Sequence, residues 1–129
     1  MKSFEFKEHK GAERKNTIII DGKKFMLNVT SFNTFTAIDN YNSKRASIYK
    51  KAEKAEKAGN RKKTGGAIID HHKLVVETVD KILGKGSYQR IFENREINFE
   101  DDIDVLMYIF DCVTELADKA REEYEHPVN

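Results

Sequence analysis

The sequence contains one cysteine, one proline and no tryptophan in 129 residues. A single cysteine cannot form a disulfide within the chain, so nothing here indicates an oxidising compartment. The longest apolar run, residues 105–110, is far shorter than the roughly 20 residues that span a bilayer. The first ten residues also lack the apolar stretch of a secretory signal. We therefore expect a cytoplasmic protein with no membrane segment.

The chain also lacks an excess of positive or of negative charge. The chain carries 23 Lys and Arg against 22 Asp and Glu, and its formal net charge of +1 creates no field that would gather nucleic acid or anionic lipid. Apolar residues make up 39% of the chain, which suffices for one modest core. The length fits one domain over residues 1–129, because two domains would each have too little interior.

Two apolar runs predict a β-hairpin near the N-terminus. Thr17–Ile20 and Lys24–Val29 flank Asp21-Gly22, a dipeptide suited to the positive φ angles of a tight turn. Phe4 and Phe6 alternate with charges and extend the predicted β region over residues 1–29. Because an isolated hairpin is marginally stable, it must pack on other elements.

The rest of the chain predicts helices, because apolar residues recur at spacings of three and four. Thr30 or Ser31 can cap the first helix, and Asn98 can cap the last, which runs to about Glu123. A second helix ends at Gly84, where a left-handed conformation is expected, and a short turn follows it. The stripes expected to face the core are Phe35, Ile38, Tyr49 and Ala52 in the first helix, and Ile68, Ile69, Val75, Val76, Val79, Ile82 and Leu83 in the second.

Large apolar residues are missing between residues 50 and 63, where seven side chains are basic. We predict a solvated helix end here and then a basic linker, so that residues 50–66 separate the first two helices, with Thr64-Gly65-Gly66 breaking the chain. The sequence as a whole predicts an α+β fold, mostly α. In it the hairpin packs on a bundle of three to four helices formed by residues 30–129.

No group of side chains predicts catalysis, a cofactor or a metal. Asp70-His71-His72 are neighbours on a helix and point about 100° apart, so they cannot chelate one ion together. His72 falls in the middle of the apolar stripe and is interpreted as a core or interface histidine, with His71 at the stripe's edge. Cys112 has no adjacent cation to lower its pKa and is interpreted as a small buried side chain. The acidic residues between 101 and 104 fit helix capping better than a calcium loop.

The last helix is apolar over roughly half of its circumference, more than a surface helix needs. It is either a central helix packed on both sides by its own chain, or it keeps a stripe that binds another molecule. We expect helix-in-groove contacts with a partner there, and expect Asp at Ile109 or Leu116 to abolish them without unfolding the domain. The predicted contact residues are Phe92, Val105, Tyr108, Ile109, Cys112 and Leu116.

Charge is unevenly distributed along the chain. Residues 44–63 hold nine basic and two acidic side chains, whereas residues 93–125 hold twelve acidic and three basic ones. This dipolar pattern suits head-to-tail self-association or a charged partner, although each run alone is also typical of a solvated helix face. Nucleic-acid binding by the basic run is disfavoured, because Tyr49 is its only flanking aromatic residue.

Several local motifs follow one another between Asn16 and Tyr124. They are the Asp-Gly-Lys opening followed by alternating apolar residues, Ile-Leu-Gly at residues 82–84, and the aromatic residue and Ile-Phe within residues 86–92. A long polar helix lies between the first two motifs, and a terminal acidic helix follows the last. This order of parts resembles the small tail assembly chaperones of long-tailed, siphovirus-type bacteriophages and prophages.

The resemblance implies a non-enzymatic chaperone in the host bacterial cytoplasm. Such a protein binds the tape measure protein, keeps it soluble, helps to recruit the tail tube protein, and is absent from the mature virion. The resemblance also implies self-association into oligomers or spirals, and it carries over no catalytic residues. The alternatives are a structural tail or head-tail connector subunit and, less favoured, a small nucleic-acid-binding protein.

Overall fold

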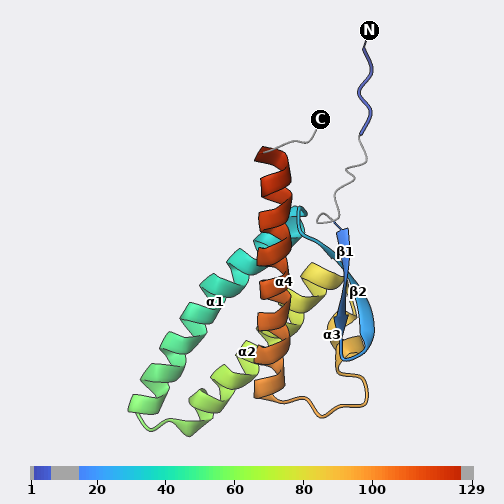
Figure 1. Cartoon of the computed structure of the whole chain (residues 1–129). Coiled ribbons are helices and arrows are strands. Elements are labelled where there is room, and N and C mark those ends of the chain that lie inside the picture. The colour runs from blue at the N-terminus through green and yellow to red at the C-terminus, as the bar shows by residue number, and fades with distance from the viewer. Residues whose placement is uncertain (1, 7–14, 126–129) are drawn as a thin grey trace.

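The computed structural model describes residues 2–6 and 15–125 (Figure 1). Within these residues a two-stranded antiparallel sheet precedes four helices, so the predicted α+β, mostly α fold is confirmed. The elements are β1 Lys15–Ile20, β2 Lys23–Asn28, α1 Phe32–Lys57, α2 Arg61–Leu83, α3 Ser87–Ile91 and α4 Phe99–Glu125.

The predicted hairpin is present. Asp21 and Gly22 adopt φ angles of 50° and 77° and join β1 to β2, with Ile18 opposite Phe25 in the register. Side chains alternate between a buried face and an exposed face, as expected for a sheet covered on one side. The buried face presents Ile18, Ile20, Phe25 and Leu27, and the exposed face presents Ile19 and Met26.

The β region does not extend to residues 2–6. This segment lies outside both strands, and the Phe4 and Phe6 side chains are exposed, so our prediction for it is wrong. Alternation of apolar and charged residues forms a strand only where a neighbouring strand accepts its backbone hydrogen bonds. Residues 7–14 of the predicted β region lie outside the described residues.

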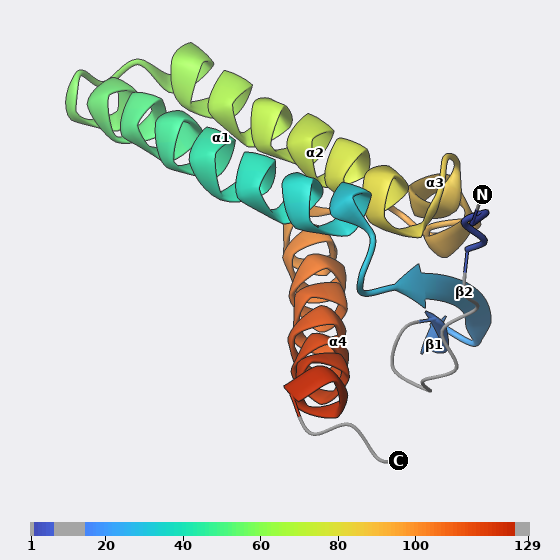
Figure 2. The same cartoon turned by 90° about the horizontal axis from the view of Figure 1, so that it is seen from above.

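The α1 and α2 helices lie side by side and antiparallel (Figures 1 and 2). The predicted solvated helix end is present, since α1 continues to Lys57, but the predicted linker over residues 50–66 is wrong, because α2 already begins at Arg61. Alanine, lysine and glutamate favour helix even where nothing apolar is buried. Asn60 then caps α2 by accepting a hydrogen bond from the Lys63 backbone N–H at 3.1 Å, and Gly65 and Gly66 are accommodated inside the helix.

The buried stripe of α1 differs from the predicted one. Ser31 caps the helix as expected, but Phe35 is 44% exposed and Tyr49 is also exposed, while the buried positions are Thr34, Ala37, Tyr41 and Ala55. The Thr34 hydroxyl donates to the Asn28 carbonyl at 2.8 Å. Polar residues can occupy this stripe because each finds a hydrogen-bond partner, which hydropathy alone does not reveal.

The core forms where the sheet, α2, α3 and α4 meet. The α4 helix crosses the α1–α2 pair at a steep angle, and Asn98 caps it as predicted (Figure 2). Gly84 ends α2 with a positive φ of 112°, but its ψ of 150° lies outside the left-handed helical region. None of the described helices is long and apolar enough to span a membrane. Large buried side chains from all four helices, and Phe92 directly after α3, belong to this core: Tyr41, Leu74, Val75, Val79, Ile82, Tyr88, Ile91, Phe92, Leu106, Ile109 and Val113.

Candidate functional site

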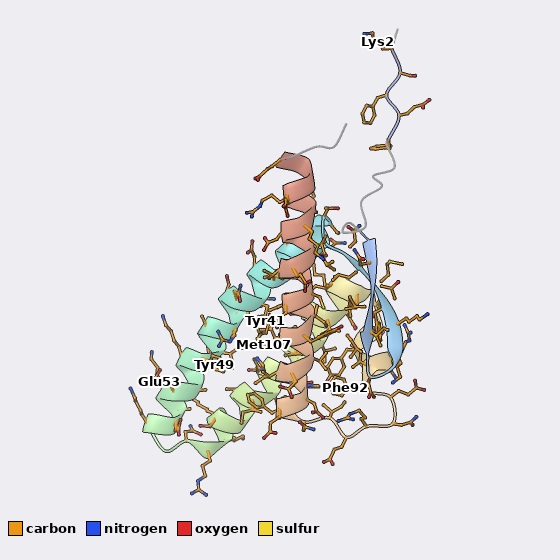
Figure 3. All side chains as sticks on the ribbon, in the orientation of Figure 1. Lys2, Tyr41, Tyr49, Glu53, Phe92 and Met107 are labelled. Carbon is orange, nitrogen blue, oxygen red and sulfur yellow. The ribbon has the colours of Figure 1, made fainter. Side chains whose placement is uncertain are left out.

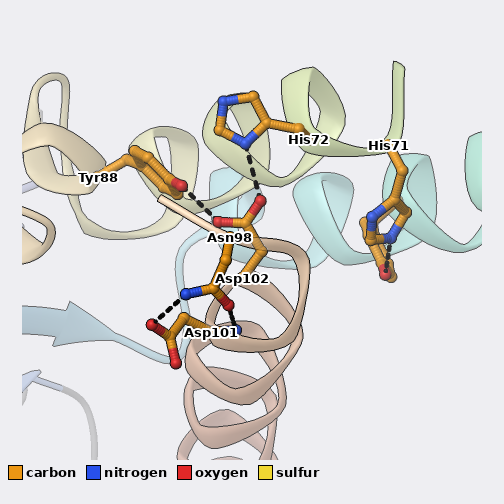
Figure 4. A network of polar contacts seen from close by, with 7 residues as sticks. His71, His72, Tyr88, Asn98, Asp101 and Asp102 are labelled. Carbon is orange, nitrogen blue, oxygen red and sulfur yellow. Dashed lines mark hydrogen bonds and ion pairs between the residues drawn. The ribbon is translucent and has the colours of Figure 1, made fainter. Parts of the chain in front are cut away.

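A buried carboxylate joins three helices near the start of α4 (Figure 4). Asp102 is 1% exposed. The Tyr88 hydroxyl of α3 donates to one oxygen of Asp102, and His72 Nδ1 of α2 lies 2.8 Å from the other. We call Tyr88, Asp102 and His72 the polar junction.

The electrostatics of the polar junction favour a protonated tyrosine. Burial, followed by the hydrogen bond to Asp102, raises the pKa of Tyr88 well above its ordinary value. The hydroxyl therefore keeps its proton and donates it to the carboxylate. The backbone N–H of Tyr88 donates to Asp80 at 2.8 Å, which fixes α3 against α2.

A histidine and an aspartate in contact raise the question of catalysis. In a catalytic triad, the second ring nitrogen of the histidine holds a hydroxyl or thiol nucleophile. Among the described residues, His72 has its hydrogen bond to Asp102 and no nucleophile on Nε2. No three His, Cys, Asp or Glu side chains in the described part of the chain gather closely enough to hold a metal ion. We interpret the polar junction as a clamp that fixes α2, α3 and α4.

The burial of the two histidines is the reverse of the prediction, which placed His72 in the middle of the apolar stripe and His71 at its edge. His71 is 1% exposed, whereas the His72 side chain is 35% exposed. His71 Nε2 shares a hydrogen bond with the Tyr41 hydroxyl at 2.9 Å, and its ring stacks on Tyr49. Tyr41 and Tyr49 lie on α1 (Figure 3). The buried stripe of α2 is centred on His71 because α1 covers that side of the helix, a contact that the sequence does not specify.

Burial determines the protonation of His71. It lowers the pKa of the imidazole below its ordinary value, with smaller contributions from charges nearby. In the described chain, Nδ1 of His71 is buried and has no hydrogen-bond partner. The neutral ring is therefore the form that fits this site.

The predicted contact residues fall into two groups. Phe92 is 5% exposed and stacks on Tyr88, and Ile109 is fully buried, so both belong to the core and neither is available to a partner. Val105, Cys112 and Leu116 are half-buried against the core. Tyr108 is 41% exposed. The apolar arc of α4 is wide because the helix packs on α2 and also lies beside β1, so only part of it can face a partner.

A groove lies between β1 and α4. It has a volume of about 330 Å³, and Ile19, Tyr108, Cys112, Glu115 and Leu116 are among its lining residues. Burial and a hydrogen bond with the Cys112 thiol raise the pKa of Tyr108, while a hydrogen bond from the Ile19 backbone acts in the opposite direction. The Tyr108 hydroxyl therefore covers part of the edge of β1.

Exposed apolar side chains continue this groove onto the sheet. Ile19 and Met26, on the outer face of the hairpin, are 56% and 57% exposed. They are diagonal neighbours, because Met26 stands opposite Thr17 in the register. We define the hairpin–α4 surface as Ile19, Met26, Tyr108, Cys112 and Leu116.

Two parts of these sites were not assigned from the sequence. Asp102 was assigned to helix capping because it stands in an acidic run at a helix start. No sequence pattern distinguishes it from Asp101, whose backbone N–H donates to the capping residue Asn98 and whose carboxylate accepts from the Asn98 side chain. Strand alternation places Met26 on the face opposite Phe25 and Leu27, but neither Ile19 nor Met26 was named as a contact residue from the sequence.

Comparison with protein-family models, curated proteins and solved structures finds no match to this chain.

Proposed function

We propose that this protein is a non-enzymatic tail assembly chaperone of a long-tailed bacteriophage or prophage. It binds the tape measure protein in the host cytoplasm, keeps it soluble and helps to recruit the tail tube protein. The observation that carries this proposal is the hairpin–α4 surface, where aliphatic, thioether and aromatic side chains stand exposed beside a groove. Exposed apolar side chains that adjoin a groove are typical of protein-binding sites.

The chemistry of the surface fits an apolar helix. Its edge is formed by Ile19 and Tyr108. Tyrosine often contributes a large share of the binding energy at protein interfaces, because its ring is large and rigid. Cys112 and Leu116 lie one and two turns further along α4, so they follow the spacing of a helical partner. A long apolar helix bound here has part of its surface removed from water, which opposes aggregation.

The charge around the groove selects among apolar helices. Glu115 lines the groove, and Asp104, Asp111 and Asp118 are exposed along the same helix. These carboxylates favour a partner segment whose apolar stripe is flanked by lysine or arginine. They also keep the chaperone soluble while its apolar side chains are exposed.

Co-expression with the tape measure protein of the same phage genome tests the proposal. We expect the wild-type chain to keep the tape measure protein soluble and to co-purify with it. Ile19→Asp and Met26→Asp place a charge on the exposed sheet face, so both variants should stay folded and lose the complex. Ile68→Asp is the matched control, because Ile68 is 50% exposed on α2, away from this surface.

Each outcome of this experiment is informative. If the tape measure protein precipitates with the wild-type chain and nothing co-purifies, the proposed function is wrong. If the complex forms equally well with Ile19→Asp and Met26→Asp, the hairpin–α4 surface is not the binding site. A structural tail subunit, unlike a chaperone, remains in the particle, so detection of this chain in purified virions by mass spectrometry would also contradict the proposal.

A further inference from the structure

The far end of the α1–α2 pair projects away from α4 and the sheet (Figures 1 and 2). Residues 50–63, which form this end, hold seven basic and two acidic side chains. The first turn of α2 contains Arg61, Lys62 and Lys63 and no acidic residue. Positive charge at a helix N-terminus opposes the helix dipole, so the stability of α2 does not account for these residues.

A groove with a basic rim lies between the two helices at this end, with a volume of about 660 Å³. We call it the basic groove. Its floor contains small and aliphatic residues, namely Ile48, Ala55, Gly66 and Ala67. Three lysines and one carboxylate line it as well, namely Lys51, Lys54, Lys63 and Asp70. Within the described chain none of these three lysines forms an ion pair, so their charges are available to a ligand.

Gly66 lies in the floor, where no contact among the described residues requires a glycine. Glycine in a helix interior costs about 1 kcal/mol relative to alanine. A Cβ atom added at Gly66 would meet no described residue within 4 Å, so the packing of residues 2–6 and 15–125 does not explain the missing side chain. Open backbone of this kind permits the close approach of another molecule.

We propose that the basic groove binds an acidic amphipathic α-helix of a protein partner. The apolar face of that helix, built from small and aliphatic residues, lies on the floor over Gly66 and Ala67. Its carboxylates, spaced three and four residues apart, meet Lys51, Lys54 and Lys63 at the rim. This site is separate from the hairpin–α4 surface, and it does not depend on the proposed role in tail assembly.

The floor of the groove favours a helix over a nucleic acid. Single-stranded nucleic acids bind by stacking bases on exposed aromatic rings. The described residues that line the basic groove include no aromatic side chain, and the Tyr49 ring on α1 already has the Arg45 guanidinium 4.7 Å from its centre and His71 stacked on it. An apolar floor with a lysine rim complements a helix that carries apolar residues on one side and carboxylates on the other.

The test is a titration of the full chain with a synthetic helix of about 18 residues, or roughly five turns, followed by fluorescence anisotropy. The probe carries glutamate on one face and alanine and leucine on the other. A second peptide has the same composition in permuted order, so it has the same charge but no apolar face. We expect the amphipathic peptide to bind at least about tenfold more tightly, a difference of about 1.4 kcal/mol, and to lose affinity as salt rises.

Two pairs of variants locate the site. Lys51→Glu should weaken binding about tenfold or more, whereas Lys50→Glu, which changes charge equally but lies outside the groove lining, should weaken it less. Gly66→Gln fills the floor and should also weaken binding. Gly65→Gln is its control, because Gly65 lines a different groove and gains the same helix propensity. Both glutamine variants should be at least as stable as the wild type, so lost binding cannot be attributed to unfolding.

Three results would overturn the proposal. Equal binding of the permuted peptide would show that charge alone attracts it. Tighter binding of a single-stranded oligonucleotide than of the peptide, lost in Lys51→Glu, would identify a nucleic-acid site. Self-association of the chain in light scattering, abolished by Lys51→Glu and Gly66→Gln, would make a second copy the occupant.

Discussion

The two ends of the α1–α2 pair have the same secondary structure and different compositions. At one end, Leu74, Val75, Val79 and Ile82 of α2 are buried. At the other end, the helices carry lysine, alanine and glycine, and Ile68 and Ile69 are exposed. The first end explains why the chain folds.

The second end requires another explanation. An isolated pair of helices without a large apolar seam is marginally stable in water, so extending it beyond the core adds little to stability. Residues that contribute little to stability are not constrained by folding, so their composition can suit the binding of a partner. Folding therefore depends on the core end of the pair, and the far end is where we propose that a charged partner binds.

The largest effect is expected from a charge in the core. Ile109→Asp places a carboxylate at a position with 0% exposure, and we expect it to remove more than about 4 kcal/mol of unfolding free energy and to abolish the folded state. This replaces our expectation from the sequence that the variant stays folded. Met107→Asp, at a position 43% exposed on the same helix, should stay folded. Circular dichroism and urea titration check both, and a folded Ile109→Asp variant would contradict the assignment of this residue to the core.

The polar junction should give the next largest effect. Asp102→Ala leaves the Tyr88 hydroxyl and the His72 ring without their shared acceptor, which should lower the unfolding free energy by about 3 kcal/mol. Asp104→Ala on the exposed side of α4 should change it by less than about 0.5 kcal/mol. Urea titration measures both values. Equal effects of the two substitutions would show that Asp102 acts only as a helix-start charge.

His71 predicts a dependence of stability on pH. Its pKa is lowered by burial in the folded state, so below its ordinary value of about 6.5 the unfolded chain binds a proton that the folded chain does not. Stability contributed by the neutral ring is present above pH about 6.5 and is lost as pH falls below it. In the His71→Phe variant, the decrease in unfolding free energy that protonation of His71 causes at low pH should be absent. Urea titrations of both proteins between pH about 7.5 and 5.5 test this, and identical pH slopes would contradict it.

The smallest changes in unfolding free energy are expected at the far end of the α1–α2 pair, and there the substitutions should stabilise the protein. Gly65→Ala and Gly66→Ala should each raise the unfolding free energy by up to about 1 kcal/mol, because alanine restricts the unfolded chain and nothing crowds the added methyl group. Thermal denaturation measures this change. A fall in melting temperature would show that the fold itself needs these glycines.

Local signals in the sequence predicted the elements well. Asp21-Gly22 located the hairpin, and Ser31 and Asn98 located two helix starts, because turn and cap residues act on their immediate neighbours. The predicted linker at residues 50–66 was wrong because the absence of large apolar residues and the Thr64-Gly65-Gly66 sequence were interpreted as the end of a helix and a break in the chain. Helix propensity and the packing of α1 on α2 continue both helices through this segment.

Burial was harder to predict than the elements. Tyr41 and His71 occupy the interface of α1 and α2 through a hydrogen bond between residues 30 positions apart, which hydropathy does not encode. Phe92, which follows α3, and Ile109 of α4 were taken as free surface because the sequence does not show which sides of these two helices the rest of the chain covers. The groove between β1 and α4 was not predicted for the same reason, although three of the predicted contact residues, Tyr108, Cys112 and Leu116, do line it.

Amide hydrogen exchange along α2 most directly tests the division of this molecule into a folding end and a recognition end. We expect amides from Val75 to Ile82 to exchange only through global unfolding, and amides from Gly65 to Ile69 to exchange through local opening at much lower free energy. Addition of the amphipathic acidic peptide should slow exchange at the far end. Uniform protection along α2 in the free protein would contradict the division, because the far end would then belong to the folding core.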